Sequence, residues 1–358
     1  MKIKVIENKD IEAWDEYVYT HPRATLYHLS GWKNVIQKTY GHKTFYLMAV
    51  KDEGAICGVL PLVHIRHFIF GNTLFSIPFF DLGGVLASNE ESENALLIEA
   101  MRLARKLRAK NIELRHIEPL SYLHSDMIDN FDLRRALQTR SHKVLMRLEL
   151  PESSEELMNS FRAKLRSQVK KPIKEGLTAK IGGKEFLDDF YKVFLINMRD
   201  LGSPVHSKRL MKNVLDEFPG KARIVTVYKE NQVLACGFVI GFRNILENPW
   251  ASALREYSHL SPNMLLYWTM LAYACDNDYA YFDFGRSSPD EGTYKFKAQW
   301  GATPTQLNWH NIYLNNPPPQ HAETYEKSRF DKVIEYWKKL PVSLTRIIGP
   351  MIRKHIGL

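Results

Sequence analysis

The stretch AICGVLPL at residues 55–62 aligns without gaps with LACGFVIG at residues 234–241, so that Cys57-Gly58 stands opposite Cys236-Gly237. Each copy follows a strand-like run and a polar turn, which read FYLMAVKDEG at 45–54 and RIVTVYKENQ at 223–232. Apolar and β-branched residues on both sides of a short polar turn predict a β-hairpin. The sequence therefore predicts the second arm of one kind of hairpin twice in a single chain.

The order of elements downstream of the two hairpins also repeats. In the first half an apolar helical run, ALLIEAMRLARKLRAK, precedes NIELRHI, and in the second half NMLLYWTMLAYACDN precedes YAYFDFG. A chain of 358 residues also exceeds the roughly 250–300 residues at which single cores stop growing. We predict an α+β fold with two domains of similar topology, residues 1–150 and 151–315. Residues 316–358 are predicted to form a Pro-rich linker, which begins with NNPPPQ at 315–320, and a helical tail.

Composition and charge limit the classes of function that the protein can have. The formal net charge is +9, which favours an anionic partner such as phosphate, nucleic acid or a lipid surface. No secretory signal opens the chain, and no apolar run reaches the roughly 18 residues of a membrane span. The three cysteines are widely spaced and fit neither a disulfide framework nor a zinc site. We expect a reduced, cytoplasmic protein without a metal.

The second half opens with a basic segment, PESSEELMNSFRAKLRSQVKKPIKEG at 151–176, for which Ser153 or Ser154 is the candidate N-cap. Two sets of residues recur every fourth position and predict neighbouring apolar and basic stripes on one helix: Phe161, Leu165, Val169 and Ile173, and Arg162, Arg166, Lys170 and Lys174. Pro172 is expected to kink the helix or to end it near Lys171. Because Glu175 is the one acid from 161 to 175, phosphate or nucleic-acid contact is as plausible as a solvated basic face.

The densest mixture of residue types is FDFGRSSPDEGTYKFKAQWG at 282–301. A buried strand is predicted to place Asp283 on one face, a Ser-Pro-Asp turn follows, and two aromatic residues then alternate with lysines as far as Lys297. With PTQLNWHNIYL at 304–314, this stretch resembles the signature of the Fem-type aminoacyl/peptidyl transferases, and within them the branch associated with PEP-CTERM/exosortase systems and exopolysaccharide loci. The basic segment resembles the Lys/Arg-rich opening of that family's second domain.

The resemblance implies two tandem GNAT-like acyltransferase domains, each a mixed sheet flanked by helices, and no bound metal or cofactor. Known members move amino acids from aminoacyl-tRNA to the peptide stem of a peptidoglycan precursor. By that pattern Phe296 and Lys297 lie near the ester of the acyl donor. We assign Lys297 to polarise the acyl carbonyl, and Asp283 to orient Lys297 or Arg286 or to accept the amine proton. Arg286 is expected to bind a carboxylate or phosphate.

Further candidates follow from the same region. Tyr257 and Tyr294 are assigned as proton donors or hydrogen-bonding groups, and Phe296 and Trp300 as substrate contacts. The basic stripe adds three candidate binding residues, Arg162, Arg166 and Lys170. The opposing interpretation makes Tyr294, Phe296 and Trp300 core residues and makes Asp283–Arg286 a buried ion pair.

Three functions stay open. The first is amide formation on an amine of an anionic peptidoglycan-like or exopolysaccharide precursor, with aminoacyl-tRNA as donor. The second is N-acyl transfer from acyl-CoA or acyl-carrier-protein thioesters. It is disfavoured because HLSPNMLLYW at 259–268 lacks a glycine-rich phosphate loop. Pro172 and the absence of a long coiled-coil insertion count against tRNA in turn. The third is a non-catalytic module that binds a glycan precursor or RNA.

The last residues, EYWKKLPVSLTRIIGPMIRKHIGL at 335–358, carry no acid after Glu335 and mix basic with apolar residues. Such a segment favours peripheral contact with the anionic inner-membrane surface, close to a lipid-linked acceptor. A helix that packs back on the first domain is the equally weighted alternative.

Overall fold

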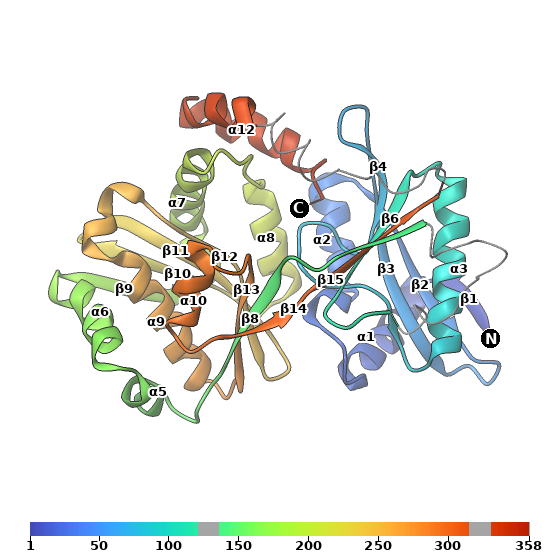
Figure 1. Ribbon diagram of the computed structural model, residues 1–358, viewed down its shortest axis with the longest axis horizontal. Helices are drawn as coiled ribbons and strands as arrows, with labels where there is room; N and C mark the ends of the chain where they lie inside the picture. Colours follow the sequence, from blue (N-terminus) through green and yellow to red (C-terminus); the bar gives the residue numbers. More distant parts are fainter. Residues whose placement is uncertain (121–135, 315–330, 358) are drawn as a thin grey trace. The chain divides into compact units, whose positions relative to one another are not determined.

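The computed structural model describes residues 1–120, 136–314 and 331–357, which divide into two compact units (Figure 1). The first unit holds the described residues up to 143, together with 306–314 and 354–357. The second unit holds residues 144–305 and 331–353. The predicted Pro-rich break at 315–320 lies outside the described residues.

The first unit is built on one mixed sheet in the order β1-β2-β3-β4-β6-β15-β7, with β5 beside β3. Its strands are β1 (Lys2–Val5), β2 (Lys43–Val50), β3 (Ile56–His67), β4 (Gly71–Phe75), β5 (Leu86–Ala87), β6 (Asn111–His116), β7 (Leu137–Arg140) and β15 (Asn308–Tyr313). Its helices are η1 (Asn8–Asp10), α1 (Ile11–Thr20), η2 (Leu26–His28), α2 (Gly31–Tyr40) and α3 (Glu90–Lys106). Alternation along β2 separates the faces: Leu47 joins the core with α3, and Tyr46 packs on Trp14 of α1.

The second unit repeats this plan in a sheet with the order β14-β8-β13-β12-β11-β10-β9. Its strands are β8 (Val144–Glu149), β9 (Leu177–Gly182), β10 (Ala222–Lys229), β11 (Gln232–Phe242), β12 (Ile245–Ala253), β13 (Tyr281–Ser287) and β14 (Thr303–Gln306). Its helices are α5 (Ser154–Ser160), α6 (Ala163–Lys174), η4 (Lys184–Phe186), α7 (Leu187–Asp200), α8 (Lys208–Glu217), η5 (Arg255–Leu260), α9 (Pro262–Cys275), α10 (Gly292–Ala298) and α12 (Val342–Arg353). Helix α9 packs on one sheet face, and α7 packs on the other through Phe190 against Phe238.

The duplication predicted from the two Cys-Gly hairpins is confirmed. Cys57 lies on β3 of the β2–β3 hairpin and Cys236 on β11 of the β10–β11 hairpin, and both thiols are buried. In each unit the next strand pairs in parallel with the strand that follows the apolar helix, as β4 with β6 and β12 with β13. The fold class is therefore α+β with two units of the same topology.

Two strands belong to a different unit from the one that their place in the sequence suggests. The predicted boundary at 150 put β8 in the first domain, yet β8 pairs with β13 of the second unit. The predicted boundary at 315 put β15 in the second domain, yet β15 pairs with β6 and β7 of the first. Each sheet thus contains one strand that the predicted boundaries assigned to the other domain. Backbone hydrogen bonds between residues distant in sequence determine which sheet each strand joins.

The basic segment forms two helices where the spacing predicted one. Ser153 caps α5 as expected, since its hydroxyl accepts from the backbone N–H of Glu156. The chain then turns at Phe161, and Arg162, in an extended conformation, is the N-cap of α6. Pro172 does not end the helix, which runs on to Lys174. Because Ile173 is 52% exposed, the apolar stripe stops at Val169.

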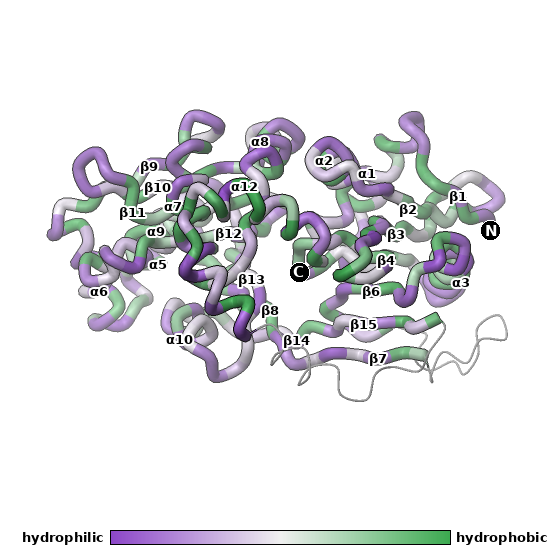
Figure 2. The backbone as a smooth tube through the Cα atoms, turned by 90° about the horizontal axis from the view of Figure 1, so that it is seen from above, coloured by the Kyte–Doolittle hydropathy of each residue, from purple (hydrophilic) through white to green (hydrophobic). Residues whose placement is uncertain are grey.

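The tail helix α12 packs on the second unit. Its contacts are with α7, and a Cβ on Gly349 would lie only 3.0 Å from Cγ1 of Val205. The predicted alternative, packing on the first domain, is therefore wrong for α12, although residues 354–357 belong to the first unit. Figure 2 shows hydrophobic and hydrophilic residues alternating along this helix. Within the described residues no helix is long and apolar enough to cross a membrane.

Candidate functional site

The parallel strands β12 and β13 of the second unit pair over three residues only and then part. The last paired residues are Glu247 and Asp283. At this point both strands carry irregularities with their outer neighbours, β12 between Glu247 and Trp250 and β13 between Asp283 and Arg286. Bulges of this kind bend a strand and are common beside active sites. The bulge on β13 contains Gly285 at a φ of 73°, a conformation that glycine adopts without strain.

Two side chains satisfy main-chain carbonyls that these bulges release from the sheet. The ammonium of Lys297 donates to the carbonyl oxygens of Gly285, at 3.0 Å, and Arg286, at 2.8 Å. The amide of Asn248 donates to the carbonyl oxygens of Phe238, at 2.8 Å, and Trp250, at 3.0 Å. Buried carbonyls need such partners, so each side chain fixes one of the two diverging strands.

A row of charged residues crosses three neighbouring strands at the same point. Glu247 on β12, Asp283 on β13 and Arg147 on β8 are direct register partners and so share one sheet face. Both carboxylates are buried, and Oδ2 of Asp283 lies 3.2 Å from Nη2 of Arg147. Oδ1 of Asp283 accepts the backbone N–H of Gly285 at 2.8 Å. Asp283 therefore holds the bulge whose carbonyls bind Lys297.

The segment after the turn, in which aromatic residues alternate with lysines, is a helix, α10. A helical period buries Lys297 and leaves Phe296 and Tyr294 only partly buried against the core. Trp300 is a core residue at 1% exposure, and its ring lies 5.7 Å from that of Phe161. The burial of Trp300 thus agrees fully with its interpretation as a core residue, and the partial burial of Tyr294 and Phe296 agrees with it in part.

Two buried polar atoms near the end of β13 have no hydrogen-bond partner among the described residues. They are the hydroxyl of Ser287 and the indole nitrogen of Trp300. A buried polar group without a partner is costly, which is why such groups are infrequent and often mark functional positions. The ring of Tyr267 lies 6.5 Å from that of Trp300 and 4.9 Å from that of Phe296. Burial raises the pKa of Tyr267 to about 12, so this ring stays neutral.

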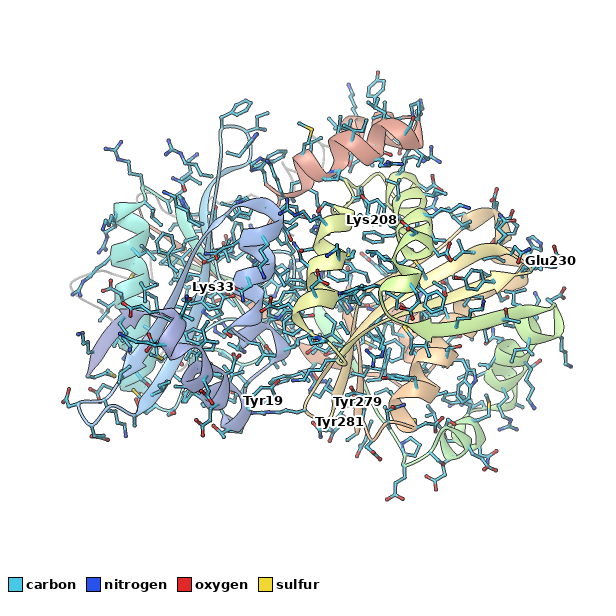
Figure 3. All side chains as sticks on the ribbon, turned by 180° about the vertical axis from the view of Figure 1, so that it is seen from behind. Tyr19, Lys33, Lys208, Glu230, Tyr279 and Tyr281 are labelled. Carbon is cyan, nitrogen blue, oxygen red and sulfur yellow. The ribbon has the colours of Figure 1, made fainter. Side chains whose placement is uncertain are left out.

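The structure brings Asp283, Arg286 and Lys297 together and places Tyr257 on a separate element. Arg286 is half-buried on β13, where its carbonyl binds Lys297. Tyr257 lies on η5, and its hydroxyl accepts from Nε2 of Gln232 at 2.7 Å. Figure 3 labels Tyr281, which begins the strand that carries this cluster.

The basic stripe is present in part. Arg162 and Lys170 are exposed, whereas the guanidinium of Arg166 donates to the carbonyl of Phe161 at the junction of α5 and α6. The edge contact of Phe161 with Trp300 connects that junction to the signature segment. Ser261 precedes α9 in a left-handed conformation and its side chain makes no cap hydrogen bond.

Three residues of this site were not identified from the sequence: Arg147, Glu247 and Asn248. A local signal existed for two of them, because the Glu-Asn-Pro run interrupts an apolar strand, and proline within a strand marks an edge or a bulge. Arg147 lies 136 positions before its partner Asp283, and only the strand register joins them.

The first unit repeats the position of the carboxylate. On β6, Glu113 is the last residue paired in parallel with β4, as Asp283 is on β13. An arginine again binds this carboxylate, since Nη2 of Arg115 lies 2.6 Å from Oε1 of Glu113. On the other side of Glu113, Asn311 of β15 occupies the register position that Arg147 has in the second unit. The described residues contain no group of three or more His, Cys, Asp or Glu side chains that could hold a metal.

Comparison with known proteins agrees with this geometry. Residues 159–298 match the sequence profile of the acetyltransferase (GNAT) domain, which covers α6 through α10. The lipid II:glycine glycyltransferase of Staphylococcus aureus is 24% identical over 218 residues, or 56% of this chain and 49% of that protein. The chain thus spans about half the length of the relatives that it matches in sequence.

Two solved structures show the same fold. FemX superposes with a TM-score of 0.66 at 18% identity, over 88% of this chain and 98% of that one. A tandem GNAT protein from the clavulanic acid biosynthesis pathway superposes with a TM-score of 0.54 at 11% identity, over 88% of this chain and 100% of that one. The predictions of a tandem GNAT-like fold and of an acyltransferase-type domain are confirmed. The chain consists of two tandem GNAT-like domains, of which the second matches the acetyltransferase (GNAT) profile, and it is similar to FemX in fold and to a lipid II:glycine glycyltransferase in sequence.

Proposed function

We propose that the protein forms an amide by moving an acyl or aminoacyl group to an amine of an anionic cell-envelope precursor. The precursor class is peptidoglycan-like or an exopolysaccharide intermediate, and the second choice follows the resemblance to the PEP-CTERM-associated branch. The sequence similarity to a lipid II:glycine glycyltransferase supports an envelope acceptor. The reaction is assigned to the cytoplasmic side of the membrane, where such precursors are made.

The observation that carries the proposal is the parting of β12 and β13 beside Lys297. Parallel strands that stop pairing leave backbone N–H and C=O groups on their inner edges for another partner. An extended acyl donor can bind such edges as a strand would. The parting begins immediately after the buried Glu247 and Asp283, so the donor's carbonyl would lie close to a fixed set of charges.

In the transfer step the amine nitrogen attacks the acyl carbonyl carbon and an amide bond forms. The ester or thioester bond to the carrier breaks, and the leaving oxygen or sulfur takes up the proton that the amine loses. Negative charge develops on the acyl oxygen, and we assign the Lys297 ammonium to stabilise it. Asp283 is a positioning residue, since it acts through Gly285 on the carbonyls that hold Lys297. Arg286 is assigned to a phosphate or carboxylate of a substrate. Tyr257 and Tyr294 are assigned to hydrogen bonds with donor or acceptor.

The donor that we propose is aminoacyl-tRNA, bound in part through Arg162, Arg166 and Lys170. Arg162 and Lys170 are exposed, and Arg166 has one contact with main chain. A specific observation favours a second donor, an acyl-CoA or acyl-carrier-protein thioester, because residues 159–298 match an acetyltransferase domain.

The membrane contact that we propose uses the outer face of α12. Leu344, Ile347 and Met351 are 41%, 65% and 61% exposed, and the described residues after Glu335 contain no acid. Apolar side chains among basic ones suit an anionic lipid surface.

A transfer assay with two donors tests the proposal. Purified protein receives aminoacyl-tRNA or acetyl-CoA with a soluble amine-bearing peptidoglycan precursor, and mass spectrometry detects the amide. We expect amide formation from aminoacyl-tRNA, weakened by salt and by the double change Arg162→Ala and Lys170→Ala. Lys164→Ala is the matched control, because Lys164 is exposed on the opposite side of α6. Turnover with acetyl-CoA alone would assign the thioester donor, and amide formation with neither would refute the transfer to such an acceptor.

A further inference from the structure

The second unit contains a cavity of about 530 Å³ that is remote in sequence from the signature segment. It is bounded by α7, the first turn of α8 and α12. The lining residues are Asp188, Tyr191, Lys192, Leu195, Ile196, Ser207, Lys208, Val342, Arg346 and Pro350. Figure 3 labels Lys208 at the start of α8.

Three cations line the cavity against one acid. Lys208 forms an ion pair with Asp188. Lys192 and Arg346 are exposed and have no hydrogen bond or ion pair within the part of the chain that the structure describes. Ser207 adds the N-terminal end of α8, whose backbone N–H groups carry partial positive charge. The cavity therefore has excess positive charge suited to an anion.

The remaining wall is apolar. Leu195 and Ile196 come from α7, and Val342 and Pro350 from α12. The hydroxyl of Tyr191 donates to the carbonyl of His206 at 3.0 Å, and burial raises the pKa of Tyr191 to about 12, so its ring adds no charge. Inorganic phosphate would leave this apolar wall uncovered. A ligand that fits both parts has an anionic head and a hydrocarbon tail.

Helix α12 has three distinct faces: one lines the cavity, one is buried against the unit, and one is exposed and apolar. At 100° per residue, Val342, Arg346 and Pro350 form one stripe along the cavity. Thr345 and Gly349 form the buried stripe, and Leu344 and Ile347 belong to the exposed apolar face on the remaining side. The cavity stripe and the exposed apolar stripe thus lie on one short helix.

We infer that this cavity is a second binding site, which takes a single-chain amphiphile with a phosphate or carboxylate head. The anionic group lies between Lys192 and Arg346, and the first carbons of the chain contact Leu195 and Val342. The site is independent of the proposed transfer reaction. Its ligand chemistry is met both by a lipid drawn from a membrane and by a soluble fatty acyl anion.

Calorimetric titration of the full chain with decyl phosphate, below its micelle concentration, tests the site. We expect one molecule bound per chain. We also expect affinity about tenfold weaker in Arg346→Glu and in Lys192→Glu, because each change removes a charge-assisted contact. Lys339→Glu is the matched control, since it changes the tail's charge equally at an exposed residue outside the cavity. Inorganic phosphate and decanol are titrated alongside.

Each outcome of these titrations either supports or overturns the proposed site. Saturable binding of decyl phosphate that the two cavity variants weaken and the control does not would support the site. Equal affinity for inorganic phosphate would overturn the amphiphile, and equal weakening by Lys339→Glu would reduce the effect to surface charge. Sedimentation with phosphatidylglycerol vesicles then assigns the source. Vesicle binding lost in Arg346→Glu and kept in Lys339→Glu indicates a membrane lipid, whereas unchanged vesicle binding with decyl phosphate affinity lost indicates a soluble acyl anion.

Discussion

The ammonium of Lys297 lies 3.0 Å from the carbonyl oxygen of Gly285, at the bulge where β13 leaves β12. The same ammonium binds the carbonyl of Arg286, and the backbone N–H of Gly285 is bound by Asp283. One glycine thus connects a buried cation to a buried carboxylate through its own peptide groups. A change at any of the three residues is expected to reach the other two.

Replacing Lys297 by alanine removes the hydrogen-bond donor to two carbonyls. The free energy of unfolding is expected to fall by about 1–3 kcal/mol, measured by chemical denaturation. If Lys297 also stabilises the acyl oxygen, transfer by the folded fraction falls by about 10²–10³.

Two further variants separate the contributions of Lys297 to stability and to catalysis. Lys295→Ala removes an exposed lysine from the same helix and should change neither quantity. Lys297→Arg restores a donor to the carbonyls and should recover stability better than turnover, because the charge moves. Full turnover in Lys297→Ala at normal stability would refute both assignments.

Gly285→Ala places a Cβ at a φ of 73°. The left-handed conformation costs an L-residue about 1–2 kcal/mol, which should appear as a lower unfolding midpoint. Gly292, at the first position of α10, has no positive φ and nothing within 4 Å of an added Cβ. Gly292→Ala is therefore expected to be neutral or slightly stabilising, and an equal loss in both variants would contradict the strain.

The Asp283–Arg147 pair is suited to a double-mutant cycle. Asp283 is buried and the Arg147 side chain is 29% exposed, so solvent screens the pair only in part. We expect Asp283→Ala and Arg147→Ala each to destabilise the protein and to couple by about 1–2 kcal/mol in urea unfolding. Additive effects would show that the two residues act separately.

His28 predicts a loss of stability at mildly acidic pH. Burial lowers the pKa of His28 to about 4, and its Nδ1 accepts the backbone N–H of Thr25. The unfolded chain binds this proton below about pH 6.5, so stability rises with pH between about 4 and 6.5 and is lost as the pH falls. Acidification from pH 7 to pH 5 should cost about 2 kcal/mol through this group. Urea unfolding across this range should show a flatter dependence in His28→Gln, and an unchanged slope would contradict the assignment.

The membrane contact of α12 is best tested at its surface. A chain ended after Leu340 would uncover the α7 surface and Val205, so its behaviour would mix unfolding with lipid binding. Ile347→Asp changes a side chain that is 65% exposed and should leave the thermal midpoint unchanged. We expect reduced flotation with anionic liposomes, and the control Val333→Asp tests an exposed apolar residue before the helix. Unchanged flotation of Ile347→Asp would refute the contact.

Much of the fold could be predicted from the sequence because its signals are local. The two Cys-Gly hairpins, the apolar runs of α3 and α9 and the strand before the Ser-Pro turn all follow from short patterns. Asp283 and Lys297 were predicted from the same short segment, and the structure places them on either side of Gly285.

The features that could not be predicted depend on contacts between residues distant in sequence, or on whether a short segment forms a strand or a helix. Arg147 and Glu247 join Asp283 only through strand register. The alternation before Trp300 is compatible with a strand, yet these seven residues form a helix whose lysine completes the bulge. At the break between α5 and α6 the ring of Phe161 packs on Trp300, 139 positions later, and spacing along one helix does not reveal this contact.

The exchange of β8 and β15 between the two sheets has a consequence for biosynthesis. On the ribosome, β6 emerges early, but its partner β15 is complete only at residue 313, after the strands of the second sheet have been made. The amino-terminal unit therefore cannot finish its sheet while the second is being translated, and β6 lacks its partner strand β15 during that time. The second sheet, which needs only residues 144–306, can close first. Although the first unit begins to be synthesised earlier, the sheet of the second unit is therefore completed first.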